Sequence, residues 1–328
     1  ARPTYRELEQ RIKKLEKSEL NSKKFHERAV HIKQVLLAIR SVNQLITTET
    51  NPKHLIERAC DSLTSTLGYF NTWIALIDET ETVAMTASCG FNGHFKIMDQ
   101  RLCRGDYVNC MKRVLKEEEF LVIADPASEC TDCPLTGEYS GRAGMSCRLS
   151  GNGKIYGIIS VSVPVNYARD SEEQQLFKEL AEDLAFALQK IDQAKILKQA
   201  NDIIVRSPAV AFVWRNAEGW PVEFVSDNAD RMFGWTARDF ISGAISYPEV
   251  MNPDDLDHVA KEVEKSCADP NAINVKHCDY RILCKNGDIR WIEDMTYIRR
   301  ADDGTITAFE GILLDITERK QEIGRAHV

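Results

Sequence analysis

The stretch Phe309-Glu-Gly-Ile-Leu-Leu-Asp-Ile-Thr-Glu-Arg-Lys320 joins an apolar strand directly to the charged start of a helix. We expect Thr317 to be the helix N-cap, because its hydroxyl can accept hydrogen bonds from the free N–H groups of the next turn. Asp315 and Thr317 are the predicted signal-relay residues at this joint. A strand joined rigidly to a helix passes a change in a domain core to whatever follows, so we expect the chain to be the input half of a larger protein.

Composition and charge narrow the classes of partner. Of the 328 residues, 28% are charged and 43% hydrophobic, and the length predicts two domains with connecting helices. The net charge of −8 argues against nucleic acid and against anionic membranes, because there is no basic excess to bind either. No apolar run approaches the ~18 residues that span a bilayer. We expect a cytoplasmic protein, with a membrane tether through an upstream region left open.

Residues 1–46 are predicted to form one long helix with two apolar stripes. Leu8, Ile12 and Leu15 form the first stripe. The second stripe comprises Phe25, Ala29, Ile32, Leu36 and Ile39. The two are offset by a three-residue slip, which locally overwinds a coiled coil. The other faces are charged, so we expect a parallel homodimer to bury the stripes. The alternative is a helix folded back onto its own domain.

The rest of the chain is predicted to be α+β, with two domains built on antiparallel sheets. The first domain covers 47–170, with strands at 71–77, 82–88, 120–123, 143–149 and 154–163 and a hairpin turn at Gly151-Asn-Gly153. A helix at 171–206 connects it to a second domain at 207–317. That domain ends in strands at 275–284, 289–297 and 305–314, and Asn286-Gly287 predicts a type I′ turn. Residues 318–328 are expected to begin an output linker helix or to be a truncation remnant.

The second domain resembles a PAS sensory domain over about residues 200–320. The motifs that carry this resemblance are Val225-Ser-Asp-Asn-Ala229, Phe233-Gly-Trp235, Asn252-Pro-Asp-Asp255, Tyr280-Arg281, Asn286-Gly287, Arg290-Trp-Ile292, and Gly311 with Asp315-Ile-Thr-Glu-Arg-Lys320.

The first domain is similar to GAF domains over about residues 47–190. The resemblance is carried by Ala143-Gly144, Arg148-Leu149, Tyr156-Gly157, Ser162-Val-Pro164 and the helix from Leu176-Phe177 to Ala185-Phe-Ala-Leu188.

The two resemblances together imply a tandem sensory region of a bacterial or archaeal signal-transduction protein. They imply pockets in both sheets, parallel dimeric helices, and an output domain beyond this chain. That output domain would be a histidine kinase of a two-component phosphorelay, acting on a response regulator, or a cyclic-dinucleotide enzyme. No kinase hallmark occurs in these residues, so we expect no enzyme in this chain.

Ten cysteines without a secretion signal fit a reducing cytosol, and four of them form a candidate metal site. Cys130 and Cys133 have the C-x2-C spacing that can grip one ion, and Cys110 and Cys103 would supply further ligands if helix and loop approach each other. Zinc, an iron–sulfur cluster, a redox-responsive thiol site, haem held by Cys133, or ordinary packing cysteines all remain open. A thiol enzyme that reduces free methionine sulfoxide, or a dimerisation scaffold with empty pockets, is the alternative function.

The PAS pocket is predicted to be lined by apolar residues and one histidine. The candidates are Trp214, Phe224, Phe233, Met251, His258 and Ile282. Such aromatic residues more often form core than contact a ligand. His258 stands on the helix that carries the haem ligand in some PAS proteins, although a lone helical histidine is more often solvated. The expected function is a sensory relay, in which a ligand, metal or redox change in either pocket shifts the packing of the helices.

Overall fold

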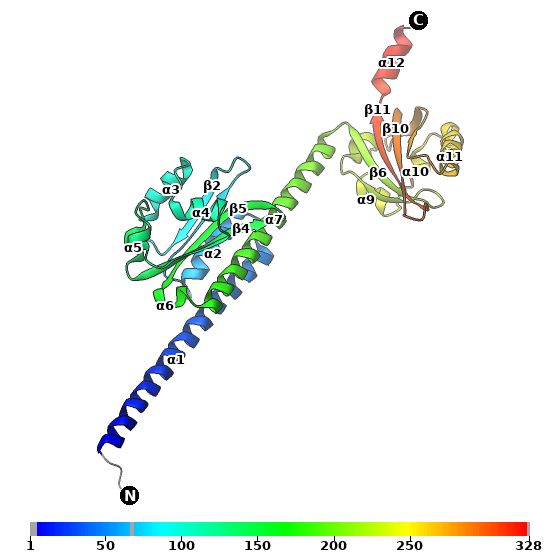
Figure 1. Ribbon diagram of the computed structural model, residues 1–328. Coiled ribbons are helices and arrows are strands. Elements are labelled where there is room, and N and C mark those ends of the chain that lie inside the picture. The colour runs from blue at the N-terminus through cyan, green and yellow to red at the C-terminus, as the bar shows by residue number, and fades with distance from the viewer. Residues whose placement is uncertain (1–4, 66–68, 327–328) are drawn as a thin grey trace. The chain divides into compact units, whose positions relative to one another are not determined.

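The computed structural model describes residues 5–65 and 69–326 (Figure 1). The chain forms two compact units, Ala1–Ala194 and Lys195–Val328, and each combines helices with one antiparallel sheet. The fold class is therefore the predicted α+β class. Predictions for residues 1–4 and for the last two residues lie outside the described part. Within it, no helix combines the length and apolar character that crossing a membrane requires.

The first unit has a five-stranded antiparallel sheet in the order β2-β1-β5-β4-β3. Its strands are β1 (Thr72–Ile77), β2 (Val83–Cys89), β3 (Phe120–Ile123), β4 (Arg142–Gly151) and β5 (Lys154–Pro164). Its helices are α1 (Tyr5–Thr48), α2 (Pro52–Ser65), α3 (Phe95–Cys103), α4 (Asn109–Lys116), α5 (Pro126–Glu129), the 3-10 turn η1 (Thr136–Tyr139), α6 (Val165–Ala168) and the greater part of α7 (Ser171–Arg206). The sequence does not predict α3, α5, α6 or η1.

The hairpin between β4 and β5 turns at the predicted place, through Asn152 and Gly153. Gly151 pairs with Lys154, and both residues between them have positive φ, 49° at Asn152 and 78° at Gly153. This is the type I′ geometry that matches the twist of the flanking strands.

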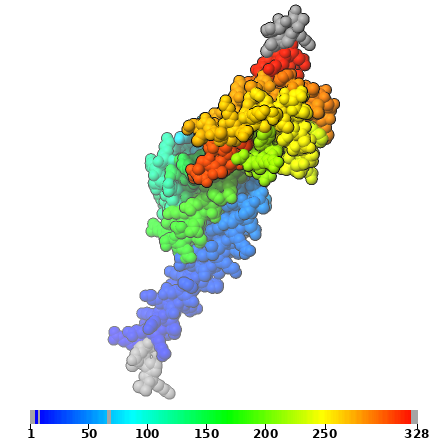
Figure 2. Space-filling view, turned by 90° about the vertical axis from the view of Figure 1, so that its right-hand side faces the viewer, coloured from blue at the N-terminus to red at the C-terminus, as the bar shows by residue number. Residues whose placement is uncertain are grey.

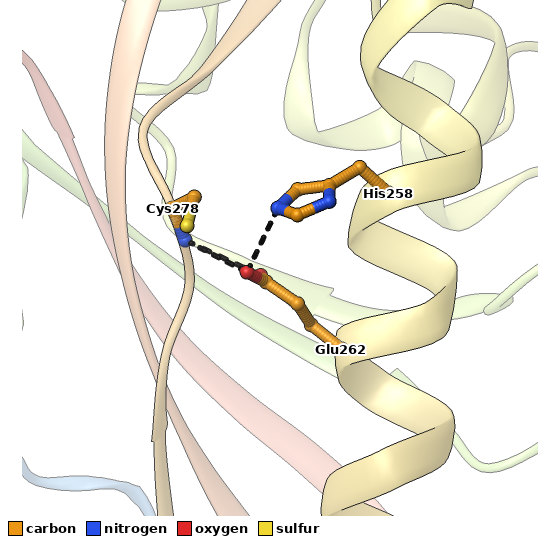
Figure 3. Close-up of side chains that lie close together, drawn as sticks. All are labelled: His258, Glu262 and Cys278. Carbon is orange, nitrogen blue, oxygen red and sulfur yellow. Dashed lines mark hydrogen bonds and ion pairs between the residues drawn. The ribbon is translucent and has the colours of Figure 1, made fainter.

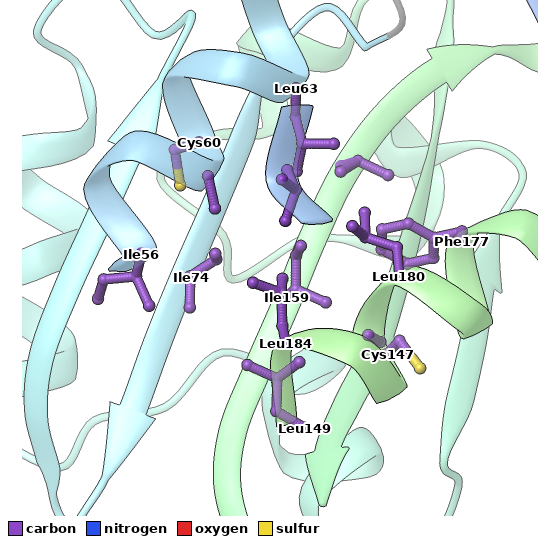
Figure 4. Packing of buried hydrophobic residues seen from close by; sticks show 14 of the residues in the cluster. Ile56, Cys60, Leu63, Ile74, Cys147, Leu149, Ile159, Phe177, Leu180 and Leu184 are labelled. Atoms are coloured by element: carbon purple, nitrogen blue, oxygen red, sulfur yellow. The ribbon is translucent and has the colours of Figure 1, made fainter. Parts of the chain in front are cut away.

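Helices cover both faces of the first sheet. On one face, α1, α2 and α7 pack on a core that includes Ile56, Ile74, Ile159 and Leu180 (Figure 4). On the other face, Trp73 and Ile158 pack with residues of α3 and α4. Cys60 and Cys147 belong to the first of these cores, as expected for packing cysteines.

The C-terminal half of α1 packs on its own unit along a stripe that was not predicted. His31, Val35, Ala38, Val42 and Leu45 are buried at alternating spacings of four and three. Of the predicted stripes, Ile39 is partly buried against the same core and Ile32 is half-buried. Ile12, Leu15, Phe25 and Leu36 are exposed, and the side chain of Leu8 lies outside the described residues. The alternative of a helix folded back on its domain therefore applies to this half, while the N-terminal part of α1 projects beyond the sheet (Figures 1 and 2).

The second unit has an antiparallel sheet in the order β7-β6-β11-β10-β8, with β9 also paired to β10. Its strands are β6 (Ala209–Arg215), β7 (Val222–Val225), β8 (Asn274–Lys276), β9 (Tyr280–Leu283), β10 (Ile289–Arg300) and β11 (Ile306–Asp315). Its helices are α8 (Ala229–Phe233), α9 (Ala237–Ile241), α10 (Tyr247–Val250), α11 (Pro253–Ala268) and α12 (Thr317–Ala326). If β8 and β9, which both pair with β10, are counted as one position, this is the strand order of the first unit.

Two predictions for the second sheet need correction. The strand predicted at 275–284 is two strands, because the chain leaves the sheet between Lys276 and Tyr280. The turn after β9 is not type I′, since only Gly287 has positive φ there. Gly287 N–H instead donates to the Cys284 carbonyl at 2.9 Å, as in a three-residue hairpin loop that ends in a left-handed glycine.

Candidate functional site

Three of the four predicted cysteines line one cavity in the first unit. Cys110 comes from α4, Cys130 follows α5, and Cys133 precedes η1. The cavity gives the centre of a water molecule about 20 Å³ of space and is walled by β1, β3, β4 and β5 residues. Its other lining residues are Trp73, Ile123, Pro126, Thr136, Tyr139, Gly144, Ser146 and Ser160.

Hydrogen bonds fix the loop that carries Cys130 and Cys133. The Cys133 N–H donates to the Cys130 carbonyl at 3.3 Å. The Thr136 hydroxyl lies 2.6 Å from the Cys130 carbonyl and 2.7 Å from that of Cys133, and Arg101 donates to the Asp132 carbonyl. A turn held at three points keeps both thiols at the cavity.

Burial keeps these thiols protonated. It raises the pKa of Cys110 to about 12 and that of Cys130 to about 11. It also raises the pKa of Cys133, against the opposing effect of Arg101. Because the thiolate is both the nucleophile and the metal ligand, the site needs a cation or a change of conformation to become reactive.

Cys103 does not join the group, which corrects the prediction. It is the last residue of α3, is exposed, and its thiol lies 3.9 Å from Asp99 Oδ1. Three thiols are a donor set that suits zinc or iron–sulfur chemistry. Within residues 5–65 and 69–326, however, the group of three donors whose ligand atoms lie within 4.8 Å is elsewhere. A haem does not fit about 20 Å³, since pockets for molecules of that size need several hundred cubic ångströms.

The second unit holds a cavity between its sheet and α10–α11. It gives the centre of a water molecule about 30 Å³, enough for about two water molecules. Trp214 and Met251 line it as predicted. The remaining lining residues are Trp220, Tyr247, Val259, Val263, Ser266, Val275, His277, Asp294, Thr296, Ile298 and Phe309.

A buried carboxylate anchors the polar part of this cavity. Asp294 is 3% exposed. It accepts hydrogen bonds from the Tyr280 hydroxyl at 2.8 Å and from the Thr296 hydroxyl at 3.0 Å, and the Tyr247 hydroxyl lies 2.6 Å from that of Tyr280. Burial raises the pKa of Asp294, against the opposing effects of His277, Tyr280 and Thr296. Burial therefore favours a neutral carboxyl more than water does, and the hydrogen bonds of the network oppose this effect.

Two further polar groups lie at the cavity wall. The buried Trp214 Nε1 has no hydrogen-bond partner among the described residues. His277 is 4% exposed, and its Nδ1 lies 3.0 Å from Glu262 Oε2. An unpartnered buried donor is costly, so Trp214 is the group that a bound acceptor would satisfy.

The other predicted pocket residues do not line the cavity. Phe233 and Ile282 are buried in the surrounding core. Phe224 is 43% exposed, because a shift in the pairing of β7 with β6 breaks the alternation and leaves Glu223 and Phe224 both exposed. His258 lies on the exposed face of α11, and its Nε2 is 3.1 Å from Glu262 Oε1.

Asp294, Thr296, His277 and Tyr247 were missed from the sequence. In β10, Asp294 and Thr296 alternate with outward residues and stand between the inward Ile292 and Ile298. Polar residues at inward positions of a strand are the signal that could have found them.

The predicted relay residues form the joint between β11 and α12, with their roles changed. Ile316, not Thr317, precedes the helix, and its carbonyl accepts from the Lys320 N–H at 3.0 Å. Asp315 accepts from the Thr317 N–H at 2.9 Å and lies 3.2 Å from Arg290 Nη1. The Thr317 hydroxyl accepts from the Trp291 N–H at 3.0 Å. These bonds tie the start of α12 to β10.

Comparison with known proteins finds a family match within the second unit. Residues 222–313 match the family model described as the PAS fold. A methyl sulfide methyltransferase-associated sensor of Methanosarcina acetivorans is 44% identical over 119 residues, which are 36% of this chain and 12% of that protein. An uncharacterized protein of Sinorhizobium fredii is 32% identical over 75 residues, which are 23% of this chain and 9% of that protein. The chain thus matches only a small part of either relative.

Solved structures of both kinds of domain are also similar. A PAS domain from Colwellia psychrerythraea covers 38% of this chain and 98% of its own, at 23% identity and a TM-score of 0.32. The GAF domain of a phosphoenolpyruvate-protein phosphotransferase from Coxiella burnetii covers 50% of this chain and 98% of its own, at 17% identity and a TM-score of 0.40. The match to the PAS fold thus covers residues 222–313, which lie in the second unit.

Proposed function

We propose that the chain is the cytoplasmic input module of a signal-transduction protein, and that the cavity of the PAS unit binds a small polar molecule. The observation that carries this proposal is the unpartnered Trp214 N–H at a cavity that also contains the buried Asp294. A small neutral molecule with one hydrogen-bond acceptor would satisfy the indole and leave the carboxyl protonated.

We propose that a change in the cavity is transmitted to α12 through the strands that line the cavity. Asp294 and Thr296 lie on β10, and the same strand carries Trp291, whose N–H binds the Thr317 hydroxyl. A ligand that moves β10 therefore acts on the first turn of α12. We propose that α12 leads to an output domain, such as a histidine kinase, which acts on a response regulator.

A parallel homodimer through α1 is part of the proposal. Phe25, Leu15 and Ile12 are 72%, 65% and 54% exposed, and a single helix stabilises such a stripe poorly. Sedimentation of the full chain tests this. We expect a dimer that Phe25→Glu weakens and Lys24→Glu does not, whereas a monomeric wild type would contradict the dimer.

A second candidate function is a metal- or redox-responsive thiol site in the first unit. It is favoured by Cys110, Cys130 and Cys133 lining one cavity. The raised pKa values of these thiols count against methionine sulfoxide reduction, which needs a thiolate nucleophile. Incubation with methionine sulfoxide and a thiol reductant tests this alternative, and turnover would favour the enzyme.

The PAS cavity is tested by thermal unfolding with formamide, acetamide and methanol as small probes. We expect at least one probe to raise the unfolding midpoint of the wild type. Trp214→Phe keeps the aromatic ring but removes the donor, so the rise should shrink. Trp220→Phe, at the same cavity, is the matched control and should keep it. Probes that leave the wild type unchanged, or that act equally on both variants, would contradict the proposal.

A further inference from the structure

A second cluster of chemically active side chains lies on the surface of the PAS unit, outside the cavity lining. His258 and Glu262 come from α11, and Cys278 comes from the segment between β8 and β9 (Figure 3). One ligand atom from each, a ring nitrogen, a carboxylate oxygen and the thiol sulfur, all lie within 4.8 Å of one another.

The chain positions these three groups from two separate elements. Residues four apart on a helix share a face, and His258 Nε2 lies 3.1 Å from Glu262 Oε1. The break between β8 and β9 brings Cys278 to this face, where its backbone N–H lies 3.2 Å from Glu262 Oε2. His258 and Cys278 are exposed, so an ion can reach the site from solvent.

The Glu262 carboxylate also contacts a buried histidine. Its Oε2 lies 3.0 Å from Nδ1 of His277, whose side chain is buried. A ligand carboxylate supported by a hydrogen bond from a buried group is common in metal sites, where such support orients the ligand. The same His277 lines the PAS cavity.

We propose that His258, Glu262 and Cys278 bind a divalent ion of the zinc class. Imidazole nitrogen, carboxylate oxygen and thiolate sulfur are the donors that zinc prefers, and three protein ligands leave the fourth position open to water. When the ion binds, the Cys278 thiol loses its proton to solvent. The ion then lies between the Cys278 thiolate and the Glu262 carboxylate, which would otherwise repel each other. The site needs no ligand in the cavity, so it stands whether or not the proposed function does.

Without a metal, the same contacts would serve only to clamp the segment at Cys278 to α11. Glu262→Gln separates the two roles, because the amide oxygen still accepts from the Cys278 N–H but lacks the charge that a cation needs. His258→Ala alters an exposed side chain and leaves the clamp intact.

The experiment titrates the full reduced chain with Co²⁺ and Zn²⁺. The background carries Cys130→Ser and Cys133→Ser, so that the first unit's paired thiols do not contribute. We expect one equivalent of bound Co²⁺ with a thiolate-to-cobalt absorption band, displaced by Zn²⁺. Cys278→Ser should abolish the band. His258→Ala and Glu262→Gln should each weaken Zn²⁺ binding at least about tenfold, with unchanged circular dichroism.

Cys103→Ser is the matched control. Cys103 is also an exposed thiol beside one carboxylate, Asp99, so its loss should leave the band and the stoichiometry unchanged. The proposal is overturned if the background chain binds no Co²⁺, or if Cys278→Ser and His258→Ala bind both ions as the parent does.

Discussion

The two units have the same strand order when β8 and β9 are counted as one position beside β10, but they differ in how their sheets are covered. In the first unit, helices pack on both faces, with α1, α2 and α7 on one side and α3 and α4 on the other. In the second unit, α8–α11 pack on one face. Outward side chains of the other face, namely Phe224, Met295, Tyr297 and Ile312, are exposed. Two domains with a shared topology can therefore expose different faces of their sheets.

The cavities differ even more than the sheets. In both units the cavity lies against the sheet face packed by the segments that follow the second strand. The first cavity has neutral thiols from α4 and a loop, and the second has a carboxyl, hydroxyls and an indole. The connecting segments, together with inward strand positions such as Asp294, therefore set the chemistry that topology leaves open.

The largest expected effect separates two glycines on corresponding last strands. Gly157 in β5 has φ +148°, and a Cβ there would lie under 3.0 Å from the carbonyl oxygen of Ala75 and from Leu76 Cα. These are backbone atoms of β1, and they cannot move away without separating β1 from β5. Gly157→Ala should therefore destabilise the first unit by about 4 kcal/mol or more, measured by urea unfolding followed by circular dichroism.

Gly311→Ala in β11 is the comparison. There a Cβ would meet ring atoms of Trp214 at 2.5 and 2.7 Å, and a side chain can move. The expected cost is about 2 kcal/mol, with a change in tryptophan emission because the ring shifts into the cavity. Equal losses for the two variants would show that the two sheets are equally tolerant at this position.

The next effect concerns the buried contact between His31 and Glu173 in the first unit. His31 of α1 lies 3.1 Å from Glu173 of α7, which is fully buried. His31→Ala leaves that carboxylate without its partner, which should cost about 3 kcal/mol in urea unfolding. Arg28→Ala, one turn earlier, removes the ion pairs of a half-exposed side chain with Asp170 and Glu172 and should cost less. A similar loss for both would mean that burial does not strengthen the pair.

The sequence predicted the elements better than the sites. Alternation and turn residues predicted strands at the positions of β1–β5, β10 and β11. They also predicted the hairpin turn at Asn152-Gly153, whereas the type I′ turn predicted at Asn286-Gly287 was wrong. The predicted strand at 275–284 was wrong because local propensity does not show that the Cys278 N–H turns away from the sheet to Glu262. Helix α3 was missed although Phe95, Met98 and Leu102, at helical spacing, are its buried residues.

The sites depend on side-chain direction, which spacing along the chain does not give. Cys103 is close in sequence to Cys110, but it ends α3 facing solvent. His258 was considered alone, and its meeting with Cys278 required the break between β8 and β9. The alternation along β10 could have revealed Asp294, because it is a polar residue at an inward position between Ile292 and Ile298. Its hydrogen bonds with Tyr280 and Thr296 depend on the fold and could not be predicted from the sequence.

The smallest expected effect is a pH dependence that tests the neutral carboxyl of the second unit. Burial raises the pKa of Asp294 above its ordinary value of 3.8. Below that value the carboxyl is protonated in both folded and unfolded chains, and its contribution to stability is fully present. As pH rises, the unfolded chain ionises first, so the free energy of unfolding falls until the folded carboxyl ionises too.

Asp294→Asn holds this position neutral, and its amide oxygen can still accept from Tyr280 and Thr296. The stability of the wild type relative to this variant should therefore decline as pH rises above 3.8, measured by urea unfolding at successive pH values. His277 and Glu262, which act on Asp294 in opposite directions, are present in both proteins.

Asp255 supplies the control of opposite sign, because Arg281 lowers its pKa. Asp255→Asn should forfeit stability that the wild type has above pH 3.8 and loses as pH falls through the lowered pKa. Parallel profiles for the wild type and Asp294→Asn would mean that the carboxyl is ionised in the folded protein, and the cavity would then suit a cation instead of a neutral molecule.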